Sequence, residues 1–328
     1  MNRNGFIPLV FAAALMAPLP LHAQQQKTAV VGFLTSGSVG SLNKRWVDAF
    51  RRGLAATGSV EGQNVKIEFS GADDHYDRLP GLAAEFVRNK VAVIVAAGGP
   101  VSALAARRAT DSVPIVFTTI SDPVKSGLVD GISRPGGNVT GIAGLTSELD
   151  PKRLELLHQF RPSTGPIGVL VNPMRPGVEA NSREMQAAAQ AVGRQAVLQN
   201  GGTDHPLDLA FEKLAQQQIT SLVVTADPFF NYRRAEVVAS AARLKVPAIY
   251  QWREFVEDGG LMSYGPGIDE AYYQSGLYAG RIIKGEKPAE LPVVQPAKFD
   301  LVVNRKTART LGIEISPLFL ARVNEVID

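Results

Sequence analysis

The sequence contains no cysteine among its 328 residues, and it has only four histidines. The absence of cysteine excludes disulfides, thiolate metal sites and cysteine nucleophiles, so stability must come from packing. The histidines are isolated from one another, and none has a metal-ligand partner at helical spacing: His22, His75, His158 and His205. We therefore expect neither a bound metal nor a cofactor.

Catalytic motifs are also missing from the sequence. It has no Gly-x-Ser-x-Gly nucleophile elbow and no Walker loop. The segment Gly32–Gly37 opens a strand-loop-helix unit, but it lacks the glycine spacing of a dinucleotide site. These absences predict that the protein has no catalytic residues and is not an enzyme.

The sequence has little excess charge of either sign, with 34 Lys and Arg against 31 Asp and Glu. Without a leader whose only charged residue is Arg3, 33 basic and 31 acidic residues remain, and the two signs are interspersed. This balance gives no indication of a nucleic-acid partner. The length and the 45% hydrophobic content are sufficient for two domains with substantial cores.

Residues 1–23 have the pattern of a cleavable signal peptide. Arg3 precedes the apolar stretch Phe6–Leu21, which is interrupted by prolines, and Ala23 ends a plausible cleavage site. A membrane anchor is the alternative, but the stretch is short and broken for a transmembrane helix. Because no cysteine follows it, lipid attachment at a cysteine is excluded. We expect a soluble, non-lipidated protein exported to the periplasm.

Two similar stretches organise the rest of the chain. The run Val91–Pro100 is short, apolar and rich in β-branched residues, ends in two glycines and a proline, and precedes an Ala-rich helix. Ser221–Pro228 repeats the pattern before another Ala-rich helix. Each stretch is typical of a buried parallel strand that leads into a helix, so the fold class is α/β with helices on both sheet faces.

Three landmarks recur at nearly constant spacing and indicate an internal repeat. Gly32 and Gly168 lie 136 residues apart in strand-like runs, Gly58 and Gly193 lie 135 apart after helices, and Val113 and Val246 begin similar strands 133 apart. We expect two similar doubly wound parallel-sheet lobes joined by a multi-strand hinge. The expected ranges are 27–143 with 259–288 for lobe 1, and 144–258 with 289–328 for lobe 2.

Ligands of open α/β sheets bind beyond the carboxyl ends of the strands, so the loops of both lobes can face one cleft. The candidate ligand-binding residues follow the expected strands. In lobe 1 they are Ser36, Ser38, Gly98, Gly99, Thr119, Ser121 and Asp122. In lobe 2 they are Asn172, Asp227, Gln251 and Trp252, and Tyr264 follows the returning strand.

The small residues of lobe 1 allow two interpretations. Gly98 and Gly99 could hold an anion on backbone amides, with a hydroxyl from Ser102, or they could form a tight turn that needs glycine. Ser36 and Ser38 could contact ligand or cap a helix.

The polar and aromatic residues near the other strand ends are equally ambiguous. Asp122 and Asp227 each precede a proline, as an N-cap does, but Asp227 could instead pair with a ligand ammonium. Asn172 suits a turn or a polar contact. Trp252 and Tyr264 could stack on a ligand ring or pack in a core or hinge.

Several segments together resemble a known protein family. The most specific one is Arg134–Gly141, and the others are Val31–Leu34, Pro114–Phe117 with Asp122–Val124, Lys152–Leu157, and Arg253–Val256 with Gly259–Gly265. The chain resembles the ABC transporter substrate-binding proteins, a family that includes tryptophan and tyrosine binders. The resemblance implies a type I periplasmic binding fold with three crossings between lobes, and delivery of a small solute to a membrane permease.

These observations together predict a monomeric periplasmic solute-binding protein of an ABC importer. We expect an amino-acid-like ligand whose carboxylate lies against Ser36 and Gly98–Gly99, whose ammonium pairs with Asp227, and whose side chain is covered by an aromatic residue. Two alternatives remain open at this point. One is a sensor module that presents ligand to a membrane receptor, and the other is a secreted enzyme that uses the same cleft.

Overall fold

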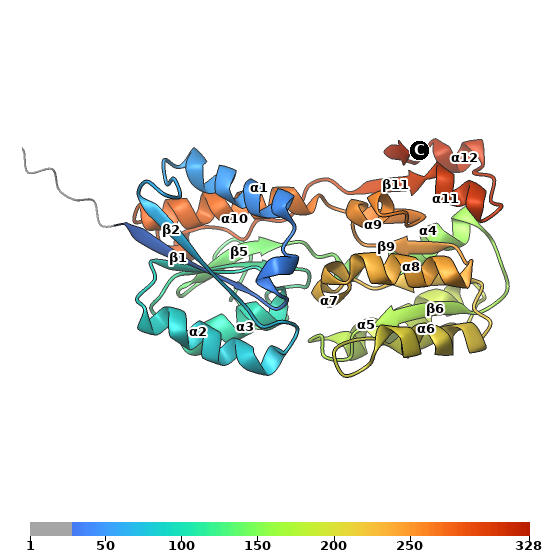
Figure 1. The fold of residues 1–328 in the computed structure, drawn as a ribbon, viewed down its shortest axis with the longest axis horizontal. Coiled ribbons are helices and arrows are strands. Elements are labelled where there is room, and N and C mark those ends of the chain that lie inside the picture. Colours follow the sequence, from blue (N-terminus) through green and yellow to red (C-terminus); the bar gives the residue numbers. More distant parts are fainter. Residues whose placement is uncertain (1–27) are drawn as a thin grey trace, which may run out of the picture.

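The computed structural model describes residues 28–328, so the signal peptide predicted over residues 1–23 lies outside the described residues. Two lobes lie side by side along the longest axis of the molecule and are joined by several chain segments (Figure 1). No helix within residues 28–328 is both long and apolar enough to cross a membrane.

The first lobe is built on a five-stranded parallel sheet in the described part of the chain, with the order β2-β1-β3-β4-β5. Its strands are β1 (Ala29–Thr35), β2 (Val65–Gly71), β3 (Val93–Ala96), β4 (Ile115–Thr119) and β5 (Val139–Ala143). One face packs on α1 (Lys44–Ala56) and α10 (Ile268–Ile283), and the other on α2 (Leu79–Arg88) and α3 (Pro100–Ala109).

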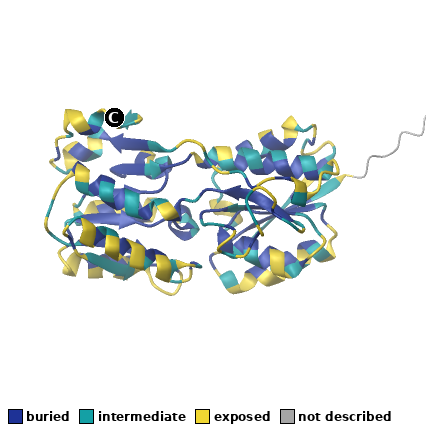
Figure 2. Cartoon of the chain, turned by 180° about the vertical axis from the view of Figure 1, so that it is seen from behind, coloured by how far each residue is buried: buried dark blue, intermediate teal, exposed yellow. Residues whose placement is uncertain are grey.

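The second lobe is built on a seven-stranded sheet among residues 28–328, with the order β12-β11-β10-β9-β8-β6-β7. Its strands are β6 (Ile167–Val171), β7 (Ala196–Asn200), β8 (Ser221–Val224), β9 (Ala248–Tyr250), β10 (Met262–Gly265), β11 (Asp300–Asn304) and β12 (Glu325–Ile327). Its helices are α4 (Asp150–Phe160), α5 (Val178–Ala191), α6 (Leu207–Gln216), α7 (Pro228–Tyr232), α8 (Arg234–Leu244), α9 (Arg253–Glu257), α11 (Arg305–Thr310) and α12 (Pro317–Leu320). Figure 2 shows buried strands inside each lobe and exposed residues on the outer helix faces.

The predicted repeat is confirmed, because β7-β6-β8-β9-β10 has the same order as β2-β1-β3-β4-β5. Gly32 and Gly168 are equivalent for a steric reason. A Cβ on Gly32 would lie 2.7 Å from the Phe86 ring, and a Cβ on Gly168 would lie 2.6 Å from Ile219 Cδ1. In both lobes, therefore, the missing side chain lets the covering layer pack directly on the first strand.

The expected lobe boundaries in the tail differ from the structure. Residues 259–288 were expected in lobe 1, but β10 pairs with β9 and β11 in the second sheet, because it completes that lobe's repeat of the strand order. The chain enters the first lobe only after Gly265. Residues 289–294, expected in lobe 2, remain with the first lobe, where Val293 N donates to Ile132 O at 2.8 Å.

A buried ion pair holds two of the three interlobe crossings together. Asp150 and Arg153 are fully buried at the start of α4, and Arg153 Nη1 donates to Asp150 Oδ1 at 2.5 Å and to Thr146 O at 2.8 Å. Arg153 Nε donates at 2.7 Å to the carbonyl oxygen of Tyr264, near the end of β10, where the second crossing begins. Asp150 Oδ1 also accepts from Ala226 N at 3.1 Å. The pair therefore fixes both crossings against the carboxyl end of β8.

Asp150 precedes Pro151, as an N-cap would, but it does not cap α4. The N-cap of α4 is Leu149, and Asp150 is the first helical residue, with Pro151 second. The carboxylate instead pairs with the guanidinium of Arg153. An unpaired buried charge costs more free energy than a helix without a side-chain cap.

Glycines on α1 and α10 give a prediction about stability. A Cβ on Gly276 would collide with the carbonyl of Phe50 and lie 2.8 Å from Leu54 N, and this backbone cannot move aside. We expect Gly276→Ala to lower the free energy of unfolding by about 1–3 kcal/mol through overpacking.

Gly81 in α2 is the matched control, because a Cβ there would meet no atom within 4 Å. Gly81→Ala should raise stability by about 0.5 kcal/mol, since alanine is the better helix former. Calorimetric unfolding of both variants checks the packing, and melting temperatures that shift in the same direction would contradict it.

Candidate functional site

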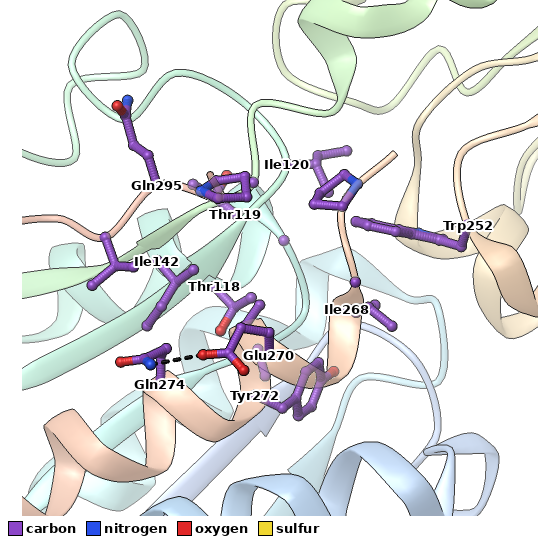
Figure 3. Close-up of a pocket in the computed structure, with 18 of the residues that line it drawn as sticks. Thr118, Thr119, Ile120, Ile142, Trp252, Ile268, Glu270, Tyr272, Gln274 and Gln295 are labelled. Carbon is purple, nitrogen blue, oxygen red and sulfur yellow. Dashed lines mark hydrogen bonds between the residues drawn. The ribbon is translucent and has the colours of Figure 1, made fainter. Parts of the chain in front are cut away.

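A cavity of about 470 Å³ lies between the two lobes, beside the crossings. Its walls come from the ends of β3 and β4, the start of α10, α7, and the loop before α9. Figure 3 shows Trp252 and Ile268 approaching it from one side, Tyr272 from below, Ile142 from the sheet of the first lobe, and Ile120 from the loop that follows β4. Most of the lining is apolar, so the cavity favours an apolar or aromatic group.

Two buried aromatic rings form part of the wall. Trp252 is 5% exposed and Tyr272 is 3% exposed. The Tyr272 ring is fixed by Trp46 and Phe33, with centroid distances of 5.6 Å and 6.3 Å. A rigid ring at this position needs no reordering before it contacts a ligand, which lowers the entropic cost of binding.

Polar groups line the cavity at few points. Gln274 Nε2 donates to Glu270 Oε1 at 2.7 Å along the first turns of α10 (Figure 3). The Thr118 hydroxyl lies 2.8 Å from the Ser275 hydroxyl. Asn231 is different, because its Oδ1 is buried and has no hydrogen-bond partner among residues 28–328. An unpartnered buried acceptor is costly, so a ligand donor at this point would be favoured.

The lobes touch each other along the side of the cavity formed by α7. Tyr232 OH lies 2.7 Å from Thr35 Oγ1, and Thr203 Oγ1 donates to Asp74 O at 2.9 Å. The structure is therefore a closed arrangement of the two lobes. Burial raises the pKa of Tyr232 to about 12, so its hydroxyl stays neutral and able to bridge the lobes.

The glycine loop of lobe 1 lies partly at the cavity. Gly99 lines it and has φ +78°, a backbone conformation that favours glycine. Gly98 lies behind it, where a Cβ would be 2.9 Å from Ser36 Oγ. The Ser36 and Ser102 hydroxyls are both buried without a partner in the described chain. Pro228 of the other lobe covers Gly99, 2.6 Å from the position of a Cβ.

The remaining lobe 1 candidates separate from one another. Thr119 lines the cavity and accepts from Ser121 N at 3.3 Å, whereas Ser38 Oγ caps the short 3-10 helix that follows it. Ser121 and Asp122 line a second groove, of about 360 Å³, which also includes Arg175. The N-cap expected at Asp122 is wrong, because its carboxylate accepts from Val124 N in a turn that leads into no helix.

The N-cap expected at Asp227 is confirmed. Its Oδ1 accepts from Phe229 N at 2.8 Å and from Asn172 Nδ2 at 3.0 Å, and Gln251 Nε2 donates to its carbonyl at 3.1 Å. The carboxylate is buried and does not line the cavity. Burial raises its pKa to about 6, although Arg175 and Asn172 act in the opposite direction. Asp227 therefore anchors α7, and α7 forms the cavity wall.

The two aromatic candidates have different positions. Trp252 lines the cavity, whereas the Tyr264 ring lies at the hinge, 6.3 Å from the centroid of Phe299. Sequence reasoning missed Tyr272, Ile268 and Asn231. The break at Pro266–Gly267 directly after a strand was the available signal for the first two.

Residues 28–327 match the family model described as ABC transporter substrate binding protein. A tyrosine-binding protein of Clostridioides difficile (strain R20291) is 28% identical over 265 residues, which cover 81% of this chain and 76% of that protein. Both comparisons span most of the two lobes.

Solved structures with the same architecture include one with a bound amino acid. An ABC domain from Streptococcus pneumonia in complex with L-Trp is 25% identical, with a TM-score of 0.81, and the match covers 92% of this chain and all of that chain. A leucine-binding protein from Thermotoga maritima shares the fold at 12% identity and a TM-score of 0.55, over 77% of this chain and 80% of that one. The architecture is that of type I periplasmic binding proteins.

The buried carboxylate of Asp227 gives a prediction about pH. In the folded chain the Asp227 carboxyl keeps its proton up to about pH 6, whereas an ordinary aspartate has a pKa of 3.8. Between these two values the folded state therefore binds more protons than the unfolded state does. Stability contributed by this group is therefore lost as pH rises from 3.8 to about 6. Asp227→Asn keeps an acceptor for the helix cap but cannot ionise. The free energy of unfolding of Asp227→Asn, relative to that of the unmodified chain, should therefore rise by on the order of 2 kcal/mol between pH 4 and pH 7.

Urea unfolding at pH 4, 5, 6 and 7 measures this difference. Asp208→Asn, on a side chain that is 73% exposed, is the control and should give a curve parallel to that of the unmodified chain. A constant difference between Asp227→Asn and the unmodified chain over the whole range would contradict the assignment.

Proposed function

The chain belongs to the family of ABC transporter substrate-binding proteins, and we propose that it binds an amino-acid-like ligand with an aromatic side chain in the interlobe cavity. The observation that carries this proposal is the cavity itself, which is closed between two lobes and walled by Trp252 and Tyr272. Cavities of about 300–1,000 Å³ with apolar walls and few polar groups are typical of small-molecule sites.

An aromatic side chain suits these walls better than a small polar one. Indole and phenol rings stack on or meet each other edge to face, and such pairs gain about 0.5–1.5 kcal/mol beyond the burial of their area. The names of two similar proteins support this choice, since one is a tyrosine-binding protein and another was solved with L-Trp.

The polar end of the ligand is assigned to α7 and to the start of α3. We assign its ammonium group to Asn231 Oδ1, because that buried acceptor has no partner within residues 28–328 and lines the cavity. We assign its carboxylate to the backbone at Gly99, where α3 begins without a side-chain cap. The unpartnered hydroxyls of Ser36 and Ser102 beside Gly98 support a polar group in this region.

We further propose that the protein acts in the periplasm as the binding component of an importer, and that it binds without chemical conversion of the ligand. The signal-peptide pattern of residues 1–23 supports the location. Family membership supports a permease as the partner. Binding proteins among the relatives support the absence of a reaction.

Isothermal titration calorimetry tests the ligand class. The mature protein should bind L-tryptophan or L-tyrosine more tightly than L-leucine, and D-ribose should not bind. Trp252→Ala should weaken the binding of the aromatic ligand roughly ten- to hundredfold, because it removes one ring of the wall.

Phe160→Leu is the matched control, because Phe160 packs on Phe319 in the second lobe, away from the cavity. It should leave the affinity unchanged. The proposal is wrong if the protein binds a sugar and no amino acid, or if Trp252→Ala binds the aromatic ligand as tightly as the unmodified chain does.

A further inference from the structure

One glycine of the first lobe lies directly beneath a tyrosine of the second. Gly37 is in the loop after β1, and Tyr232 is the last residue of α7. A Cβ built on Gly37 would lie 2.6 Å from Tyr232 Cε2 and 2.8 Å from Tyr232 Cγ. Real Cβ atoms do not approach other atoms this closely, so no other residue fits at position 37 in the closed arrangement.

The backbone of Gly37 does not itself require glycine. Its φ is not among the positive values of this chain, so any L-residue could adopt its conformation. The Tyr232 ring is held in place by its hydroxyl, which lies 2.7 Å from Thr35 Oγ1. The steric demand at Gly37 therefore comes from the other lobe.

We propose that Gly37 determines how far the two lobes can close. Without a side chain there, α7 comes down onto the first lobe, and Tyr232 and Pro228 complete the wall of the cavity. A methyl group at position 37 would hold α7 away and leave the cavity open to water. The inference rests on the proposed function in one respect, because it makes closure at Gly37 a condition of tight ligand binding.

A second contact between the lobes supports the same geometry. Pro228 Cγ lies 2.6 Å from the position of a Cβ on Gly99. Both glycines of the first lobe thus face the same short helix of the second lobe. Gly99 has a positive φ, so a side chain there would strain the backbone as well as block closure. A substitution at Gly37 affects lobe closure without this backbone strain.

Disulfide trapping measures closure without any ligand. The chain has no cysteine, so cysteines introduced by Asp74→Cys and Thr203→Cys can form a disulfide only with each other, at a point where Thr203 Oγ1 donates to Asp74 O of the other lobe. In this background, Gly37→Ala should slow oxidative cross-linking at least tenfold. Gly40→Ala, in the same loop, should cross-link like the parent, since a Cβ there would meet only Ser38 Oγ at 3.7 Å.

Tyr232→Ala distinguishes a clash with the Tyr232 ring from a general disturbance of the loop by Gly37→Ala. If the methyl group acts through the Tyr232 ring, Gly37→Ala should have no further effect on cross-linking once that ring is removed. Equal rates in Gly37→Ala and the parent would overturn the proposal, as would an effect that persists in the Tyr232→Ala background. A parent that never cross-links would also overturn it, because the lobes would then not meet as they do here.

Calorimetry with L-tryptophan separates this inference from the proposed function. Gly37→Ala, without the cysteine pair, should bind at least tenfold more weakly than the unmodified chain, while Gly40→Ala should bind equally well. If the unmodified chain binds no aromatic amino acid, the proposed ligand is wrong, but the cross-linking result still decides whether Gly37 controls closure.

Discussion

The arrangement of the two lobes depends on the buried pair of Asp150 and Arg153 at the start of α4. Removing one partner of such a pair typically costs about 3–5 kcal/mol, because the other charge is left buried and uncompensated. Here the pair also binds the backbone of both neighbouring crossings and of Ala226, where β8 ends. Asp227, the next residue, caps α7, which forms one wall of the cavity. The hinge and this wall are therefore connected through the backbone at Ala226 and Asp227.

The cavity follows from how the repeat and the crossings are combined. In both lobes, the loops that follow the carboxyl ends of the central strands line the space between the lobes. The helix α10 then follows the last strand of the second lobe's repeat but packs on α1 of the first lobe, where Gly53 and Gly276 allow close contact of the two backbones. This crossing brings Tyr272 to the cavity, and α7 brings Asn231 and Tyr232 from the opposite side.

Much of the fold could be predicted from the sequence, because periodicity and glycine placement are local signals. The repeat at Gly32 and Gly168 and the N-cap at Asp227 are examples. The boundary near Gly265 was misplaced, because the break at Pro266–Gly267 marks where the strand ends but not the sheet in which that strand pairs, which is a long-range choice. Gly99, Thr119 and Trp252 were expected at the cavity and line it, because each directly follows a strand end. Tyr272 was missed, because its position depends on which lobe its helix packs against. Whether any of these candidates touches ligand stays a prediction.

A crystal structure of the mature protein grown with L-tryptophan shows whether the ligand lies in the interlobe cavity. We expect electron density for the indole ring between Trp252 and Tyr272, with the amino group beside Asn231 Oδ1. Density in the second groove, beside Asp122 and Arg175, with the cavity between Trp252 and Tyr272 unfilled, would contradict it.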